Sequence, residues 1–287
     1  MTRRALRIAT RGSPLALYQA NAVAAKLAGD AEIVVVKTEG DRRTDQPLTE
    51  LAGRGVFTSE VQQAVIEGRA DIAVHSAKDL PSAPELQAPE LVLGCIPERA
   101  DPRDCLVGSP LGELRQGARV GTGSVRREAL LRHTRPDLEF VGLRGNIATR
   151  LARVGELDAV VGAVAALTRL ELTDRIAEAF DPSTFVPQVG QGAIAVECRR
   201  DDGNTLDRLA LIDHTDAHAC VLAERAFLAT LGGGCDAPVG AHATTSGGII
   251  TLIGFLALDG EPRWEHASDK SPSVVGPAVA RLLMGEA

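Results

Sequence analysis

The stretch Asp71-Ile72-Ala73-Val74-His75-Ser76-Ala77-Lys78-Asp79-Leu80-Pro81 joins a short apolar run to a dense set of ionisable residues. The apolar run, 71–75, predicts a buried strand, and the charged residues follow its carboxyl end. Open α/β sheets bind their ligands at the carboxyl ends of their strands. Asp79 is therefore a candidate acid or base, although a turn aspartate beside a lysine is also a common surface ion pair. His75 is better explained as a hydrogen-bonded structural histidine.

Short apolar runs alternate with helical patterns over the first two thirds of the chain, which predicts an α/β fold. A first helix should begin at Ser13, with Pro14 at its first helical position. A second should begin near Ser59, where Ser59 and Gln62 fit a capping box, and end before Gly68. The expected strands are 6–10, 33–37, 71–75, 91–95, 118–121, 138–141 and 159–162, with one more at 192–198 that could return to the first domain.

The 287 residues are too many for one ordinary domain, and two polar breaks divide them. The proline-containing segment 97–104 interrupts the α/β rhythm, and a similar break covers 181–191. We expect an α/β domain of 1–96 with 192–212 and a second α/β domain of 97–191. A small α+β domain of 213–287 should hold a long helix from 216 to about 231, strands 237–244 and 249–257, and a helix from about 273.

Composition narrows the class of function. The net charge of −7 and the 3% of aromatic residues argue against a nucleic-acid partner. Five cysteines without a Cys-x-x-Cys pair argue against a disulfide framework, and no export signal or apolar run long enough to cross a membrane is present. We expect a cytoplasmic monomer without a membrane partner. A metal site at His214, His218, Cys220 and Cys235 is not expected, because Cys220 lies in an apolar helical pattern.

Arginines gather where predicted strands give way to helices, in 9–14, 121–127 and 142–150. Arg126 and Arg127 fall in the first turn of a helix, where they oppose the helix dipole at a cost of up to about 1 kcal/mol unless an anion offsets it. Arg144 and Arg150 could face the same cleft. The segments predict a site for a small polyanion, with solvated surface arginines as the alternative. Because exposed ion pairs add little stability, leucine at Arg126, Arg127 or Arg144 should leave thermal stability nearly unchanged.

Cys235 lies in the stretch Gly232-Gly233-Gly234-Cys235-Asp236-Ala237-Pro238. Three glycines remove side chains from its surroundings, so the stretch predicts an accessible thiol. The other four cysteines lie in or near apolar segments and are expected to be core residues.

Taken together, the motifs resemble the hydroxymethylbilane synthase (porphobilinogen deaminase) family over roughly residues 8–240. They are, in order, Ala-Thr-Arg-x-Ser-x-Leu-Ala-Leu, Asp-Ile-Ala-Val-His-Ser-x-Lys-Asp-Leu-Pro, Gly-Thr-x-Ser-x-Arg-Arg, Leu-Arg-Gly-Asn and Gly-Gly-Cys. The resemblance implies two domains built like periplasmic binding proteins plus a small C-terminal domain. It implies a transferase of porphyrin and heme biosynthesis that condenses four porphobilinogen molecules head to tail, with release of ammonia, to hydroxymethylbilane.

The resemblance also assigns roles to residues. Cys235 matches the thiol that carries a dipyrromethane cofactor, and Asp79 matches the catalytic carboxylate, which would stabilise the cationic azafulvene left when ammonia departs. The implied cofactor contacts are Lys78, Ser124, Arg126, Arg127, Arg144 and Arg150. The implied substrate contacts are Arg11, Ser13, Thr122, Arg144, Arg150 and Arg169. The chain departs from the family pattern at 52–57, at Ser59 and at Gly123.

Two other functions fit parts of this pattern. A non-catalytic two-lobed protein that binds or senses small anions would explain the arginines without Asp79 or Cys235. A different transferase could use Cys235 as an acyl or alkyl carrier. The mass of a covalent adduct on the purified protein separates the three hypotheses.

Overall fold

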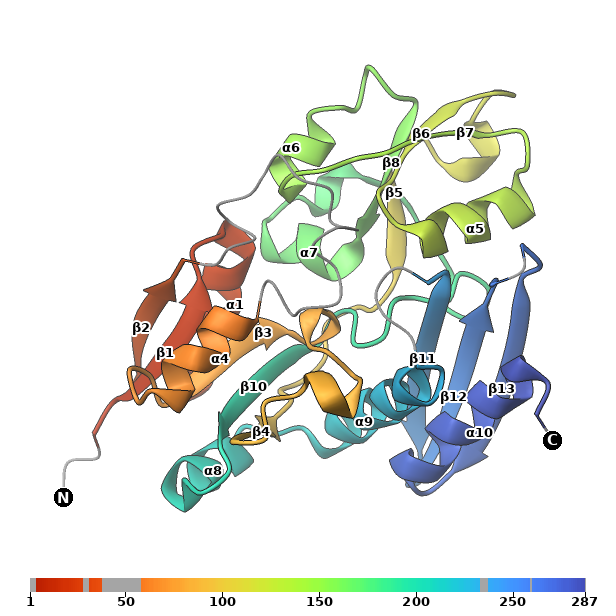
Figure 1. Cartoon of the computed structure of the whole chain (residues 1–287). Helices are drawn as coiled ribbons and strands as arrows, with labels where there is room; N and C mark the ends of the chain where they lie inside the picture. The colour runs from red at the N-terminus through yellow and green to blue at the C-terminus, as the bar shows by residue number, and fades with distance from the viewer. Residues whose placement is uncertain (1–3, 28–30, 38–57, 233–236, 259, 287) are drawn as a thin grey trace.

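The strands of the protein form three sheets (Figure 1). The computed structural model describes residues 4–27, 31–37, 58–232, 237–258 and 260–286. The first sheet has the order β2-β1-β3-β10-β4, in which β1, β2 and β3 are parallel and β10 runs antiparallel between β3 and β4. Its strands are β1 (Leu6–Arg11), β2 (Ala31–Val36), β3 (Ile72–Ser76), β4 (Leu91–Cys95) and β10 (Ile194–Arg199).

Within the described residues, three helices accompany this sheet: α1 (Pro14–Lys26), α4 (Ser59–Ile66) and α8 (Gly203–Ala210). The start of α1 is confirmed, because Ser13 is its N-cap and accepts a hydrogen bond from the Ala16 N–H at 3.3 Å. The capping box predicted at Ser59 is wrong. The N-cap of α4 is Thr58, which makes no capping bond, and the Gln62 amide donates instead to Glu197 at 2.9 and 3.1 Å.

The second sheet has the order β7-β6-β8-β5-β9. Its strands are β5 (Asp104–Gly108), β6 (Arg119–Gly121), β7 (Glu139–Val141), β8 (Ala159–Ala163) and β9 (Ile176–Ala179), and its helices are α5 (Val125–Thr134), α6 (Ile147–Leu151) and α7 (Val164–Arg169). The sequence did not predict β5 or β9. Asp104 ends the segment 97–104 that was predicted to be a polar break between domains. In the structure it is the first residue of β5 and is completely buried.

The third sheet is an antiparallel arrangement of β11 (Val239–Ser246), β12 (Ile249–Leu256) and β13 (Arg263–Asp269). One face packs on α9 (Thr215–Thr230) and α10 (Pro272–Met284), as Figure 1 shows. Alternate residues of β12 serve the two faces, because side chains alternate along a strand. Leu252 joins the core with the helices, whereas Phe255 packs into the core of the second sheet beside Leu131 and Phe185.

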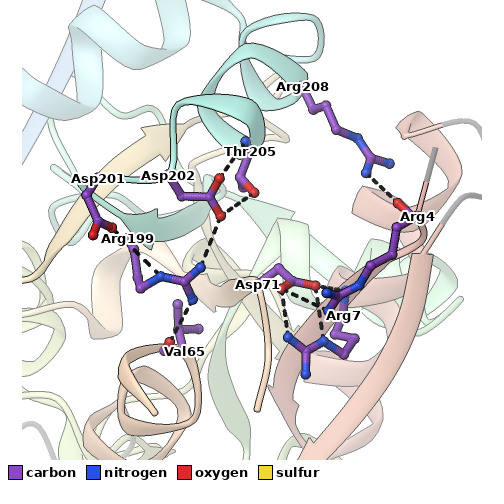
Figure 2. A network of polar contacts seen from close by, with 9 residues as sticks. All are labelled: Arg4, Arg7, Val65, Asp71, Arg199, Asp201, Asp202, Thr205 and Arg208. Atoms are coloured by element: carbon purple, nitrogen blue, oxygen red, sulfur yellow. Dashed lines mark hydrogen bonds and ion pairs between the residues drawn. The ribbon is translucent and has the colours of Figure 1, made fainter. Parts of the chain in front are cut away.

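A polar network anchors the first sheet at the end opposite to Asp79 (Figure 2). Asp71, directly before β3, accepts hydrogen bonds from the Arg7 backbone N–H and guanidinium, each at 2.8 Å. Arg199, at the end of β10, donates to Asp202 and to the Val65 carbonyl, each at 3.2 Å. These contacts fix one end of β3 and leave its carboxyl end for the site. The mixed α/β architecture with a small C-terminal sheet confirms the predicted fold class.

Candidate active site

The carboxyl end of β3 presents Lys78 and Asp79 on a single turn of 3-10 helix, Ala77–Asp79. Asp79 is exposed, and its carboxylate makes no hydrogen bond or ion pair with another described residue. The turn is joined to the segment before β10 by a hydrogen bond from the Ala77 N–H to the Ala193 carbonyl at 3.0 Å. An exposed carboxylate at a strand's carboxyl end can meet a ligand without first breaking a contact.

Lys78 connects this turn to the second sheet. Its side chain is half-buried, and burial together with the nearby Arg127 lowers the pKa of the amine to about 8, although Asp79 acts in the opposite direction. The amine lies 3.5 Å from the side-chain oxygen of Gln191, which is buried. The Gln191 amide in turn donates to Asp104 at 2.9 Å. Lys78, which follows a strand of the first sheet, and Asp104, in a strand of the second sheet, are therefore linked through Gln191.

Asp104 holds the two arginines at the start of α5. Its carboxylate lies 2.7 Å from Nη2 of Arg126, and accepts from Nε and Nη2 of Arg127 at 3.0 and 2.6 Å. Burial alone would raise the pKa of Asp104, but the two guanidiniums and the Gln191 amide outweigh it and lower the pKa to about 2. One buried carboxylate thus compensates and orients two buried cations.

The alternative that Arg126 and Arg127 are solvated surface side chains is wrong, and so is the exposed environment assumed for their leucine variants. Arg126 is 2% exposed and Arg127 is 8% exposed. Arg126 also donates to the Val186 carbonyl at 2.6 Å, and Arg127 to the Val161 carbonyl at 3.2 Å. The cause is strand β5, which places a carboxylate beneath the first turn of α5. A guanidinium has five N–H donors, so these contacts do not use all the donors of either arginine.

The hydroxyls of Thr122 and Ser124 shape the start of α5. Ser124 is the N-cap and accepts from the Arg127 N–H at 3.4 Å, while Thr122 accepts from the Ser124 N–H at 3.2 Å. Gly123 lies under the Leu143 carbonyl, and a Cβ there would come within 2.5 Å of that oxygen. Glycine at 123 therefore permits a close approach of two backbone segments.

Arg144 and Arg150 lie in and after the exposed segment that leads into α6. Arg144 is exposed. Arg150 is half-buried and donates to the Gly145 carbonyl at 2.9 Å, and burial together with the nearby Arg127 lowers its pKa. The electrostatic influence of Arg127 on both Lys78 and Arg150 means that these cations share one region.

The remaining predicted contacts lie where the first sheet meets α7. Arg11 ends β1, which pairs in parallel with β3, so Arg11 and Ser13 lie at the sheet edge that carries the Asp79 turn. Arg169, at the end of α7, donates to the Gly192 carbonyl at 2.7 Å. Burial lowers its pKa, against the opposing influence of Tyr18 on α1. Arg169 therefore lies between the two five-stranded sheets.

Two residues of this site were not predicted from the sequence, Asp104 and Gln191. Residues 52–57 and Cys235, which the sequence analysis singled out, lie outside the described residues. His75 is buried as expected, with Nε2 3.2 Å from Glu197, but this nitrogen makes no hydrogen bond with a described residue. His214 caps α9 and His218 bonds Asp213 at 2.9 Å, and the described residues hold no group of side chains suited to a metal ion. No helix in the described part of the chain is long and apolar enough to cross a membrane.

The charges of the site suit a ligand with several carboxylates. Lys78, Arg126 and Arg127 gather around a single buried carboxylate, Asp104, and Arg150 lies near Arg127. Like charges held together cost free energy. Burial is the main cause of the lowered pKa of Lys78, and the second cause is this repulsion, from Arg127. Anionic groups would relieve it, and guanidiniums bind carboxylates through paired hydrogen bonds. The residues present therefore fit a dipyrromethane, which carries carboxylate side chains on two pyrrole rings.

The chain matches two family descriptions. "Porphobilinogen deaminase, dipyromethane cofactor binding domain" matches residues 6–207, and "Porphobilinogen deaminase, C-terminal domain" matches residues 218–280. Proteins named porphobilinogen deaminase are similar over most of their length. The one from Trichlorobacter lovleyi is 45% identical over 91% of this chain and 86% of its own. The one from Roseiflexus castenholzii is 45% identical over 98% of this chain and 96% of its own.

Solved structures give more distant likenesses. The periplasmic VFT2 domain of BvgS from Bordetella pertussis is 19% identical, with a TM-score of 0.38, over 73% of this chain and 86% of its own. An arginine-specific periplasmic binding protein from Salmonella typhimurium is 15% identical, with a TM-score of 0.37, over 73% of this chain and 92% of its own.

Proposed function

The chain belongs to the porphobilinogen deaminase family. We propose which of its residues catalyse the family's reaction, which bind the cofactor and which bind the substrate. That reaction is a group transfer in tetrapyrrole assembly. Porphobilinogen is the substrate, four molecules are condensed stepwise with release of ammonia, and the product is the linear tetrapyrrole hydroxymethylbilane. The cofactor of the family is a dipyrromethane. A non-catalytic anion-binding role is not favoured.

Asp79 is the catalytic carboxylate in this proposal. One observation supports this role: the exposed Asp79 carboxylate lies on the same turn as Lys78. The charges of Arg127, Asp104 and Arg126 are close enough to influence the pKa of the Lys78 amine. A carboxylate beside groups that bind acidic side chains can face the part of porphobilinogen that becomes positive when ammonia leaves. Its negative charge stabilises that cation, and it can accept and return the pyrrole N–H proton.

The cations hold the acidic side chains of the cofactor and of the growing chain. We assign Lys78, Ser124, Arg126, Arg127, Arg144 and Arg150 to the cofactor, and Arg11, Ser13, Thr122, Arg144, Arg150 and Arg169 to substrate units. When bound, the dipyrromethane supplies the pyrrole carbon to which the first substrate unit is joined. The residues of the protein orient its carboxylates, and the buried Asp104 keeps Arg126 and Arg127 in place for them.

Cys235 is the attachment point in the proposal, on the basis of its glycine-rich surroundings in the sequence. The proposed domains remain 1–96 with 192–212, 97–191 and 213–287, and the membership of the three sheets supports this division. We also propose that the enzyme acts as a monomer in the cytoplasm. Four buried free thiols, Cys95, Cys105, Cys198 and Cys220, are consistent with a reducing compartment.

Replacement of Asp79 by asparagine tests the catalytic assignment. Asp79→Asn keeps the shape of the side chain and removes its charge, so turnover of porphobilinogen should fall by at least about a hundredfold while the thermal midpoint changes little. The matched control is Asp174→Asn, because Asp174 is also an exposed aspartate in a three-residue 3-10 helix, Thr173–Arg175. Normal turnover in Asp79→Asn, or equal losses in both variants, would contradict the role of Asp79.

A further inference from the structure

Part of the turn that carries Lys78 and Asp79 is packed in a core cluster, through Ala77 and the following Leu80, whereas Asp79 itself is exposed. The turn is a 3-10 helix of three residues, a geometry with weak internal hydrogen bonds. Directly after it, Leu80, Pro81 and Ser82 line a cavity of about 480 Å³ that is bounded on the far side by α9. A segment beside a cavity lacks packing partners on that face. Polar contacts can therefore add to the hold that the packing of Ala77 and Leu80 gives this turn.

Glu224 of α9 supports one side of the turn through Gly190. The Glu224 carboxylate is completely buried and accepts from the Gly190 N–H at 2.7 Å, and Arg99 holds it at 2.6 and 3.1 Å. Gly190 has a φ of 72° and lies against the backbone of the turn. A Cβ at this position would come within 3.0 Å of the Ala77 carbonyl carbon and the Lys78 nitrogen. The turn thus rests directly on a residue that α9 holds.

Arg225, the next residue of α9, holds the other side. Its guanidinium donates to the Pro81 carbonyl at 2.7 Å and to the Leu80 carbonyl at 3.3 Å. Burial lowers the pKa of this half-buried group, and Glu197 opposes that effect. Among the described residues no carboxylate lies within ion-pair distance of Arg225. The buried guanidinium is therefore used to hold two backbone carbonyls just after Asp79, and hydrogen bonds from a charged donor are strong.

The same helix leads to the proposed attachment point. Helix α9 ends at Thr230, and Cys235 follows five residues later in the sequence. We infer that Arg225 is a positioning residue, which fixes Asp79 relative to α9, the helix that precedes Cys235 in the sequence. The inference rests on the proposed roles of Asp79 and Cys235. Glu224 and Arg225 are adjacent on α9, and through their contacts with Gly190, Leu80 and Pro81 they hold the Lys78–Asp79 turn from two sides. Arg225 is the testable member, because Glu224 also accepts from the Ala243 N–H and its loss would disturb the fold.

The experiment compares Arg225→Met with Arg200→Met in the full-length enzyme. Arg200 is a matched control because it lines the same cavity and also donates to backbone carbonyls, those of Pro89 at 3.3 Å and Leu91 at 2.9 Å, away from the turn. Arg225→Met should lower kcat by about ten- to a hundredfold with KM changed by less than about twofold, the result of a misplaced catalytic group. Arg200→Met should keep the wild-type kcat, and Arg225→Lys should recover part of the loss.

Two further measurements distinguish positioning from general stability. Hydrogen exchange in a peptide covering 77–86 should be faster in Arg225→Met and unchanged in Arg200→Met, and intact mass should show the same adduct in all variants. Equal kcat in the two methionine variants, or a loss that only follows the unfolded fraction, would overturn the inference. A wild-type enzyme without an adduct on Cys235 would instead contradict the proposed function, and the exchange data would still decide whether Arg225 holds the turn.

Discussion

Two arginine pairs that look alike in the sequence occupy different environments in the structure. Arg126 and Arg127, at the start of α5, are buried and held by Asp104. Arg144 is exposed and Arg150 is half-buried, in and beside a short helix that packs on the second sheet. The first pair belongs to the folded core as well as to the proposed site, whereas the second pair belongs mainly to the proposed site. Arginine clustering alone therefore does not distinguish a residue that stabilises the fold from one that only binds ligand.

The comparison is sharpest at Asp104, where the largest effect is expected. Asp104→Ala leaves two buried guanidiniums without their counter-charge, so the free energy of unfolding should fall by about 3 to 5 kcal/mol. Asp137→Ala is the control, since Asp137 pairs with Arg135 near the surface. Denaturant titration of both variants measures the difference. Similar unfolding midpoints for the two variants would show that the Asp104 cluster contributes no more than a surface ion pair.

Leucine substitutions compare the two arginine pairs directly. Arg126→Leu leaves the buried Asp104 partly uncompensated and should lower the free energy of unfolding by about 3 kcal/mol. Arg144→Leu, at an exposed position, should change it by less than about 0.5 kcal/mol. The activity of Arg144→Leu should nevertheless fall through weaker binding, since a charge-assisted contact contributes about 1.5 to 3 kcal/mol. Equal free energies of unfolding for the two variants would show that the burial of Arg126 does not make it more important for stability than Arg144.

Acid titration should detect the Asp104 cluster without altering the arginines. The pKa of Asp104 is about 2 in the folded protein and near 4 in an unfolded chain, so its contribution is present above pH 4. That contribution, roughly 2 kcal/mol, should be lost as the pH falls from about 4 to about 2. Asp104→Asn should lack this part of the acid sensitivity. Parallel stability curves for wild type and Asp104→Asn between pH 5 and 2 would contradict the lowered pKa.

The smallest expected effect is on the pH dependence of activity and concerns Lys78, which lies between Asp79 and the Asp104 cluster. An amine with a pKa of about 8 loses its charge as the pH rises through 8, and with it the attraction for a substrate or cofactor carboxylate. We expect kcat/KM for porphobilinogen to fall by up to about tenfold for each pH unit above 8. Lys78→Arg keeps its charge and should shift this fall to higher pH. The same pH profile in both enzymes would assign the fall to another group.

Much of the fold could be predicted because local patterns agree with the tertiary structure. Ser13 and Pro14 define the start of α1, and the apolar run before Lys78 forms β3 as predicted. Strand β5 was missed because its first residue is a charged Asp104 at the end of a proline-containing segment. Only the tertiary structure shows that two arginines compensate this charge. Strand β9, Ile176–Ala179, was missed because only half-buried residues form it.

The same limit applies to the site. Asp79, Lys78 and the arginines carry sequence motifs, so they could be proposed without a structure. Asp104 and Gln191 act through contacts with residues far along the chain, Arg127 and Lys78, and no local pattern reports such contacts. The burial of Arg126 and Arg127 could not be predicted for the same reason. Arg225 lies in Ala223-Glu224-Arg225-Ala226, a stretch that resembles the family, but its contacts with the carbonyls of Leu80 and Pro81 could not be predicted from the sequence.

We propose above that this chain carries its cofactor on Cys235. Mass spectrometry of the intact protein, followed by mapping of the Cys235 peptide, tests it most directly. Protein made in a host that produces porphobilinogen should carry an adduct of two pyrrole units on that peptide, and Cys235→Ser should lack it. An active enzyme with an unmodified Cys235, or an adduct on Cys220 instead, would contradict the account.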